Sequence, residues 1–361
     1  MRTLDSLIMR AADATRVPAG GALAVDREGF SAYVTDTLRL FDGLTVVSEE
    51  LTELPDAPAI VATGPLTSDA LCKALERRFG ESLHFYDAAA PIVTCESLDH
   101  GKVFAASRYG RGADYLNCPM TREEYFAFRH ALVEAETVPL HDFETPRVFE
   151  GCMPVEVMAK RGELTLAYGP LKPVGLEYNG TRPFAVVQLR RDNAAGTLYN
   201  IVGFQTNLRF AEQKRVFGMI PGLEHAEFAR YGVMHRNTFL PSPKLLNFDY
   251  SLRTDPLLFF AGQMTGVEGY VESAASGLLS AISLIEKLEG RPPVDFTAKT
   301  AIGALGHYVA EYGGADFQPM NITFGLMDPL EARVRSKQQR SAAIAGRALE
   351  TVRGLKAAYA I

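Results

Sequence analysis

A glycine-rich turn after an apolar strand is the clearest candidate for chemistry in this sequence. Residues 258–261 are apolar, and glycines follow at Gly262, Gly266 and Gly269. Glycine lets the backbone turn tightly and approach a ligand closely. The helix that opens near Glu272 turns its unpaired first N–H groups toward the same space. The pattern predicts a site for a negative or electron-rich ligand, and glycines that merely pack a strand-to-helix turn are the alternative.

Cys152 is the second candidate for chemistry. It lies between Gly151 and Met153-Pro154, in an apparent turn where a thiol is exposed. A thiolate is a strong nucleophile at neutral pH once its pKa is lowered. The chain has four cysteines, dispersed without a C-x-x-C pair: Cys72, Cys95, Cys118 and Cys152. We therefore expect no structural zinc or other metal site, and no disulfide framework.

The elements that position these residues alternate between strand and helix. Apolar residues at three- and four-residue steps predict a helix from about 272 to 288, with small residues that let it lie close to a sheet. Short β-branched runs at 44–47 and 59–62 predict strands, and the second ends at Thr63-Gly64. Alternation of this kind predicts an α/β region. Such a strand and turn is also where flavoproteins of the Rossmann type pass under their cofactor.

The middle of the chain has a different pattern. Thr121 and Glu124 form a predicted capping box that opens an amphipathic helix. Residues 184–189 and 198–204 flank a five-residue turn sequence and predict a β-hairpin. The chain after residue 296 is largely helical in pattern. We therefore expect an α/β fold with a nucleotide-binding domain of residues 1–64 and 250–295, a mixed α+β insertion of 65–249, and a helical C-terminal region of 296–361.

The composition is that of an ordinary globular protein. The 361 residues are 47% hydrophobic and 22% charged, and the net charge is −6. No apolar run is long enough to span a membrane, and the N-terminus lacks a signal-peptide core, so we expect a cytoplasmic protein without a membrane partner. The net charge argues against nonspecific coating of nucleic acid. Residues 331–356 are nevertheless rich in basic side chains, which indicates either a solvated helix or a local nucleic-acid contact.

Several strings of the sequence occur together, and in the same order, in one family. They are Val17–Arg27, Ala62–Ser68, Tyr115–Met120, Phe149–Glu156, His235–Phe239, Phe260–Tyr270 and Pro319–Gly325. Over essentially the whole chain the sequence closely resembles the bacterial folate- and FAD-dependent tRNA (uracil-5-)-methyltransferases, the TrmFO family. The related GidA-type wobble-uridine modifiers share the closing motif of residues 261–270 but lack the Glu150–Pro154 string.

The resemblance implies a flavoprotein that methylates C5 of the T-loop uridine of tRNA. The implied carbon donor is methylenetetrahydrofolate, the cofactor is FAD, and NADH or NADPH is the reductant. Cys152 and Tyr270 are the implied catalytic residues, and His235 the implied folate contact. The expected flavin contacts are Thr63, Gly64, Gly262, Gln263, Gly266, Val267, Gly269 and Tyr270.

We expect tRNA phosphates to be contacted by the basic C-terminal region, above all by Arg333, Arg335, Lys337 and Arg340. Arg108, Arg111, Arg190 and Arg191 are further candidates. Cys118 lies outside the chemistry that the resemblance implies, and we interpret it as a core thiol.

The sequence departs from the family at its start. The family opens with a G-x-G-x-x-G unit that receives the FAD pyrophosphate, and this chain has no such string. A start codon placed too far downstream is the expected explanation, with a colourless, aggregating and inactive product as its consequence. Two other functions remain open: a GidA-like or other FAD-dependent oxidoreductase, and a truncated tRNA-binding homologue without catalysis.

Overall fold

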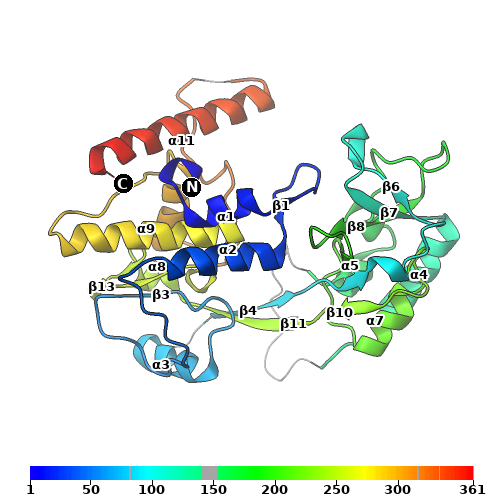
Figure 1. The fold of residues 1–361 in the computed structure, drawn as a ribbon, viewed down its shortest axis with the longest axis horizontal. Helices are drawn as coiled ribbons and strands as arrows, with labels where there is room; N and C mark the ends of the chain where they lie inside the picture. Colours follow the sequence, from blue (N-terminus) through cyan, green and yellow to red (C-terminus); the bar gives the residue numbers. More distant parts are fainter. Residues whose placement is uncertain (81–82, 140–152, 315–316, 333, 361) are drawn as a thin grey trace. The chain divides into compact units, whose positions relative to one another are not determined.

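The computed structural model describes residues 1–80, 83–139, 153–314, 317–332 and 334–360; residues 83–87, 235 and 236 are described by their backbone only. The fold is mixed α/β, with several small sheets and helices (Figure 1). The chain forms two compact units. Unit 1 comprises residues 1–10, 45–85 and 236–361, and unit 2 comprises residues 11–44 and 86–235.

These units have other boundaries than the domains expected from sequence. Residues 11–44 group with unit 2, and the C-terminal helices belong to unit 1. The chain passes between the units within β4 (Leu83–Ala88) and β11 (Met234–Phe239), which form a two-stranded sheet. The assignment of flavin binding to residues 1–64 and 250–295 stays a prediction.

Unit 1 is built on a three-stranded sheet in the order β12-β13-β3. Its strands are β12 (Ser251–Leu252), β13 (Asp255–Phe260) and β3 (Ala59–Val61). β13 pairs in parallel with β3 and antiparallel with β12. The helices of this unit are α3 (Asp69–Phe79), α8 (Ser242–Leu245), α9 (Tyr270–Leu288), α10 (Ala301–Glu311) and α11 (Lys337–Tyr359). The short η1 (Arg2–Leu4) lies against α11 (Figure 1).

Small side chains let α9 pack closely on β13, as the sequence predicted. Ser280 and Ser276 are buried on the sheet side of the helix. The Ser280 hydroxyl lies 3.4 Å from the carbonyl of Phe260, and Ser276 Oγ accepts the Gly262 N–H at 2.7 Å. The helix is thereby fixed to both the end of the strand and the start of the turn.

Unit 2 contains a six-stranded sheet in the order β10-β5-β9-β8-β7-β6, and a two-stranded sheet of β1 and β2. The large sheet consists of β5 (Ile92–Thr94), β6 (Phe104–Ala105), β7 (Tyr115–Met120), β8 (Ala185–Arg191), β9 (Leu198–Ile201) and β10 (Phe228–Arg230). The other elements are β1 (Arg16–Val17), β2 (Ala24–Val25), α2 (Arg27–Arg39), η2 (Cys95–Ser97), η3 (Arg108–Gly110), α4 (Arg122–Glu134), α5 (Val155–Arg161), α6 (Thr165–Tyr168) and α7 (Phe210–Phe217). Helix α1 (Leu7–Ala14) begins in unit 1 and ends in unit 2.

Two local predictions are confirmed in unit 2, and one prediction at the boundary between the units is wrong. The capping box at Thr121 is present at the start of α4, and β8 pairs antiparallel with β9. Residues 44–47 form no strand, and Val46 and Val47 are 73% and 66% exposed. A β-branched run becomes a strand only when a neighbouring strand receives its N–H and C=O groups. No described strand pairs with this run.

Candidate functional site

Two turns lie side by side at one edge of the sheet of unit 1. β3 and β13 are parallel neighbours, with Val61 opposite Phe260, so both strands end at the same edge. Thr63 follows the first strand, and its hydroxyl lies 3.7 Å from the sulfur of Met264, which follows the second. In open α/β sheets, ligands bind at the carboxyl ends of the parallel strands. The turns at 63–64 and 262–264, here called the paired turns, occupy that position.

Each paired turn contains a glycine, Gly64 or Gly262, with open space beside its main chain. Gly64 and Gly262 both have φ +77, which favours glycine. A Cβ at Gly64 would meet no atom within 4 Å, and one at Gly262 would meet only the Ser273 Cβ at 4.0 Å. The open space beside both main chains is what close approach of a ligand requires.

At the two later glycines of the motif, other side chains of the protein fill the space where a Cβ would lie. Gly266 has φ +85, and a Cβ there would lie 2.5 Å from Cζ of Phe317. Gly269 has φ +106, and a Cβ there would collide with the carboxyl group of Glu272. These glycines give the turn its shape, because neither has room for a side chain or for a ligand atom in its place.

Residues 317–321 support the second paired turn through main-chain and side-chain hydrogen bonds. Val267 is fully buried and forms an isolated parallel bridge with Met320. The Glu268 N–H donates to the Met320 carbonyl and the Met320 N–H donates to the Gly266 carbonyl, both at 3.0 Å. Asn321 Nδ2 adds a hydrogen bond of 3.1 Å to the Glu268 carbonyl. Val267 is therefore a buried support of the turn.

Gln263 and Tyr270 differ in how firmly they are held. Gln263 Nε2 donates to Glu268 Oε2 at 2.5 Å, which fixes the amide within the turn. Tyr270 is the first residue of α9 and is 96% exposed. A tyrosine ring that is this exposed contributes little to packing and is free to stack on a ligand.

Strand β11 joins the two paired turns. The Thr238 N–H donates to the Pro65 carbonyl at 3.1 Å, and the Leu240 N–H donates to the Met264 carbonyl at 2.8 Å. Asn237, directly before the first of these anchors, is 2% exposed, and its Nδ2 has no hydrogen-bond partner among the described residues. A buried donor without an acceptor costs about 1–3 kcal/mol. Sequence reasoning missed Asn237, although it belongs to the His-Arg-Asn string that includes His235.

Three predicted site residues cannot be placed by their side chains. Cys152 and Arg333 lie outside the described residues, and His235 is described only as a backbone position of β11, at the end of unit 2. Arg335, Lys337 and Arg340 are exposed at the start of α11, without an ion pair to a described residue.

Two other sequence candidates have structural roles. Arg108 donates from Nε to Gln188 Oε1 at 3.0 Å, and from Nη1 to the carbonyls of Lys172 and Val174 at 2.7 Å. Its guanidinium therefore holds two loops of unit 2 together. Cys118 is fully buried, and burial, with a smaller contribution from Glu224, raises the pKa of its thiol. A thiol in this state is a poor nucleophile.

The described residues include neither a membrane-spanning helix nor a metal-binding cluster. Among the helices that can be described, none has the length and apolar character needed to cross a membrane. In the same part of the chain, no group of three or more His, Cys, Asp or Glu side chains is arranged to hold a metal ion.

Comparison with known proteins gives a consistent family. The profile of the GIDA family, described as glucose inhibited division protein A, matches residues 1–292. The chain is 58% identical over 359 residues to the methylenetetrahydrofolate–tRNA-(uracil-5-)-methyltransferase TrmFO of Bacillus licheniformis, covering 98% of this chain and 83% of that protein. The protein of the same name from Streptococcus agalactiae is 57% identical over 364 residues, with 97% and 82% covered.

Among solved structures, the chain resembles GidA of Aquifex aeolicus in its form II crystal. The TM-score is 0.69 at 14% identity, with 98% of this chain and 65% of that chain covered. At that identity the likeness shows a shared fold alone. The similarity to the methyltransferases extends over nearly the whole chain. The chain belongs to the GIDA family and, within it, to the TrmFO family.

Proposed function

We propose that this protein transfers a one-carbon unit from methylenetetrahydrofolate to C5 of the T-loop uridine of tRNA, with FAD as its cofactor. One observation carries the proposal: 58% identity over 98% of the chain to a methylenetetrahydrofolate–tRNA-(uracil-5-)-methyltransferase. Since the proposed substrate is tRNA, the proposed location is the cytoplasm.

The paired turns fit the flavin of such an enzyme. Gly64 and Gly262 leave open space beside two main chains at the edge where parallel strands end. Thr63, Gly64, Gly262 and Gln263 would hold the isoalloxazine and ribityl groups, and the buried Val267 would support the turn that they belong to. Bound FAD would supply reducing equivalents for converting the methylene carbon to a methyl group. Gly266 and Gly269 would contribute by shaping the turn, since their own space is filled.

The chain's own residues would activate the uracil. C5 of uracil becomes nucleophilic when a thiolate adds to C6, and Cys152 is proposed to make that bond. Once C5 has bonded to the new carbon, removal of the C5 proton expels the thiolate from C6 and restores the ring. Tyr270, which is exposed at the start of α9, is proposed to stack on the base or on the flavin.

The folate would lie along β11. His235 is proposed to contact the pteridine, and Asn237, two residues further, has a buried amide donor that lacks a partner among the described residues. A carbonyl or ring nitrogen of the pteridine would be a suitable acceptor. NADH or NADPH is the proposed reductant. Arg335, Lys337 and Arg340, with Arg333, are proposed to contact tRNA phosphates.

The experiment is a test for ribothymidine. Chain, FAD, methylenetetrahydrofolate and NADPH are incubated with an unmodified tRNA transcript, and the digested nucleosides are analysed by mass spectrometry. In a complete enzyme that includes a G-x-G-x-x-G unit, we expect ribothymidine with the unchanged sequence and with Cys95→Ala, whose thiol is partly accessible, but none with Cys152→Ala. Flavin and tRNA binding should persist in Cys152→Ala, because the substitution removes a nucleophile and little else.

Other results would point to other functions. Flavin reduction with a product at the wobble uridine would favour a GidA-like oxidoreductase. Tight tRNA binding without any modified base would favour a binding protein. Normal ribothymidine formation by Cys152→Ala would remove the nucleophile from the proposal.

A further inference from the structure

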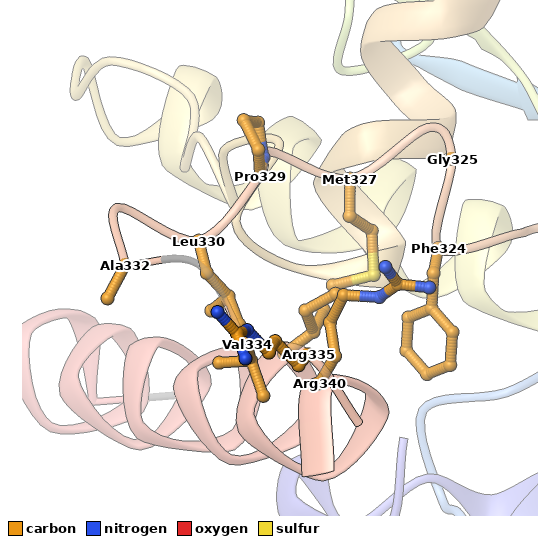
Figure 2. A pocket seen from close by; sticks show the side chains of 10 residues that line it. Phe324, Gly325, Met327, Pro329, Leu330, Ala332, Val334, Arg335 and Arg340 are labelled. Atoms are coloured by element: carbon orange, nitrogen blue, oxygen red, sulfur yellow. The ribbon is translucent and has the colours of Figure 1, made fainter. Parts of the chain in front are cut away.

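A pocket of about 670 Å³ lies between the start of α11 and the loop that precedes it. Figure 2 shows its side chains. The lining, here called the arginine pocket, consists of Phe324, Gly325, Met327, Pro329, Leu330, Ala332, Val334, Arg335, Arg340 and Ile344. It combines an apolar wall with two cationic groups and has no acidic lining residue among those described.

The apolar wall is held in place from below. Met327 and Ile344 are buried and form a small core with Ala304 of α10. The loop is also tied to the helix, because Arg347 donates from Nη2 to the Asp328 carbonyl at 2.6 Å and from Nη1 to the Pro329 carbonyl at 2.8 Å. The pocket therefore exists before any ligand arrives.

The exposed parts of the pocket are those that could contact a ligand. Phe324 is 49% exposed, although an aromatic ring is stabilised by burial. Figure 2 draws one guanidinium toward the Phe324 end of the lining and the other toward the Leu330 and Val334 end, so the two cations lie at different ends of the apolar wall. Neither Arg335 nor Arg340 has an ion pair with a described residue.

Helix stability does not explain these arginines. The N-terminus of a helix carries partial positive charge, so that acidic side chains stabilise its first turn and basic ones destabilise it. The first turn of α11 contains no acidic residue, and Arg335, Lys337 and Arg340 surround it. The positive charge at this pocket therefore favours an anionic partner.

We propose that the arginine pocket holds one unpaired nucleotide of the tRNA. Its base would lie against Phe324 and Met327, and the phosphates on either side of it would lie at Arg335 and Arg340. Aromatic side chains and arginines are the usual partners of unstacked RNA bases and phosphates. The proposal rests on the proposed function and extends it by assigning a subsite for the substrate.

The arrangement favours a nucleotide within a chain over a free one. A nucleotide inside RNA has a phosphate on each side, which matches two guanidinium groups that flank one apolar wall. A free mononucleotide has its phosphates on one side only. A free mononucleotide such as UMP should therefore compete poorly for this pocket.

The test measures tRNA affinity of the full chain over a range of salt concentrations. Removing a phosphate contact should flatten the log–log salt dependence by about 0.7 for each arginine, hence by about 1.4 for Arg335→Ala with Arg340→Ala. Phe324→Ala should weaken binding by about fivefold to a hundredfold without changing the slope, because stacking is not ionic. Phe324→Tyr should retain most of the affinity.

Matched controls lie on the same helix outside the pocket. Arg353→Ala removes an exposed charge, and Leu349→Ala removes an exposed apolar side chain. Neither should alter affinity as the pocket variants do. Thermal unfolding of every variant checks that the fold is intact.

Three outcomes would overturn the proposal. If Phe324→Ala binds tRNA normally, the arginines form only a charged surface and no base is held. If NADPH displaces tRNA from the unchanged chain but not from the pocket variants, the pocket belongs to a free dinucleotide. If ribothymidine forms and all pocket variants bind normally, the pocket has no role and the proposed function stands. If a complete enzyme with the unchanged sequence neither binds tRNA nor forms ribothymidine, the proposed function and the subsite are both removed.

Discussion

The paired turns and the arginine pocket are two regions of the same unit that are built in different ways. At the paired turns the main chain makes the surface, because Gly64 and Gly262 have positive φ and open space beside them. At the arginine pocket side chains make the surface, and they come from a loop and a helix. Ligand binding at the paired turns is therefore tested by adding a side chain, as in a glycine-to-alanine substitution. Binding at the arginine pocket is tested by removing one, as in an arginine-to-alanine substitution.

Both regions share one support. Phe317 fills the space behind Gly266, and Met327, ten residues later, lies in the floor of the arginine pocket. Helix α10 contacts this segment at both ends: Tyr308 donates to the Gln318 carbonyl at 2.8 Å, and Ala304 packs with Met327. A change in the support should affect both regions, whereas a change in either surface should affect one.

The largest expected effect is that of Gly266→Ala. The alanine would have to adopt φ +85. Its Cβ would also overlap the ring of Phe317, whose Cζ would be only 2.5 Å away. Positive φ costs about 1–3 kcal/mol, and overpacking adds about 1–3 kcal/mol. We expect urea unfolding to show a loss of about 2–5 kcal/mol. Phe317→Leu should recover part of the loss in the double variant, and strict additivity would contradict the proposed overlap.

The second largest effect is expected for Arg347→Ala, which should alter the arginine pocket but not the paired turns. It removes hydrogen bonds from a charged donor to two carbonyls, which contribute about 1.5–3 kcal/mol each at most. Part of this is recovered by water, so we expect a stability loss of about 1–3 kcal/mol and weaker tRNA binding. Flavin affinity should not change. An equal loss of both affinities would show that the two regions are not separable.

The sequence predicted the paired turns well because their information is local. Glycines at Gly64 and Gly262, each after a β-branched or apolar strand, are visible without knowing the fold. The helix at 270–288 matches the one predicted at about 272–288 from the apolar periodicity, whereas the parallel pairing of 59–61 with 258–260 is known only from the structure. The sequence could not show which glycines have open space beside them, since the space beside Gly266 is filled by Phe317, a residue distant in the sequence.

The arginine pocket could be predicted only in part. The basic run was evident, and its side chains could belong to a solvated helix or to a tRNA contact. The pocket exists because Phe324 and Met327 pack beside a helix that begins at Lys337. Such tertiary contacts leave no periodic pattern. The same limit explains the wrong strand at 44–47, since strand formation depends on a partner.

Gly262→Ala should have a smaller effect on stability than Gly266→Ala. Its Cβ would meet only the Ser273 Cβ at 4.0 Å, so the cost is that of the backbone conformation alone, with φ +77 and ψ −160, about 1–3 kcal/mol. Flavin binding should nevertheless weaken by at least about tenfold, because the methyl group would stand where the ligand is proposed to lie. Gly64→Ala is the matched variant at the other turn. Fluorescence quenching of FAD measures both, and unchanged affinity in both would place the flavin elsewhere.

The smallest effect is expected at His307, in the shared support. His307 of α10 lies 2.9 Å from Glu311 Oε1 through Nδ1, and 3.1 Å from Asp295 Oδ1 through Nε2. Its ring is also stacked on Phe248. Partial burial alone would lower the pKa of His307, but the hydrogen bonds to Glu311 and Asp295 outweigh it and leave the pKa raised. Both carboxylates accept, so the doubly protonated ring fits the site best.

The sign of the pH dependence follows from that raised pKa. The stabilisation is complete below the pKa of the unfolded chain, about 6.5, and is lost as the pH rises through the higher pKa of the folded protein. The ring is partly exposed, so we expect less than about 1 kcal/mol. Unfolding of the unchanged chain and of His307→Gln should be compared across this pH window. A wild-type stability that rises with pH relative to His307→Gln would contradict the assignment. Because α10 supports both regions, the affinities for flavin and for tRNA should fall together over that window, in contrast to the separate effects of Gly262→Ala and Arg347→Ala.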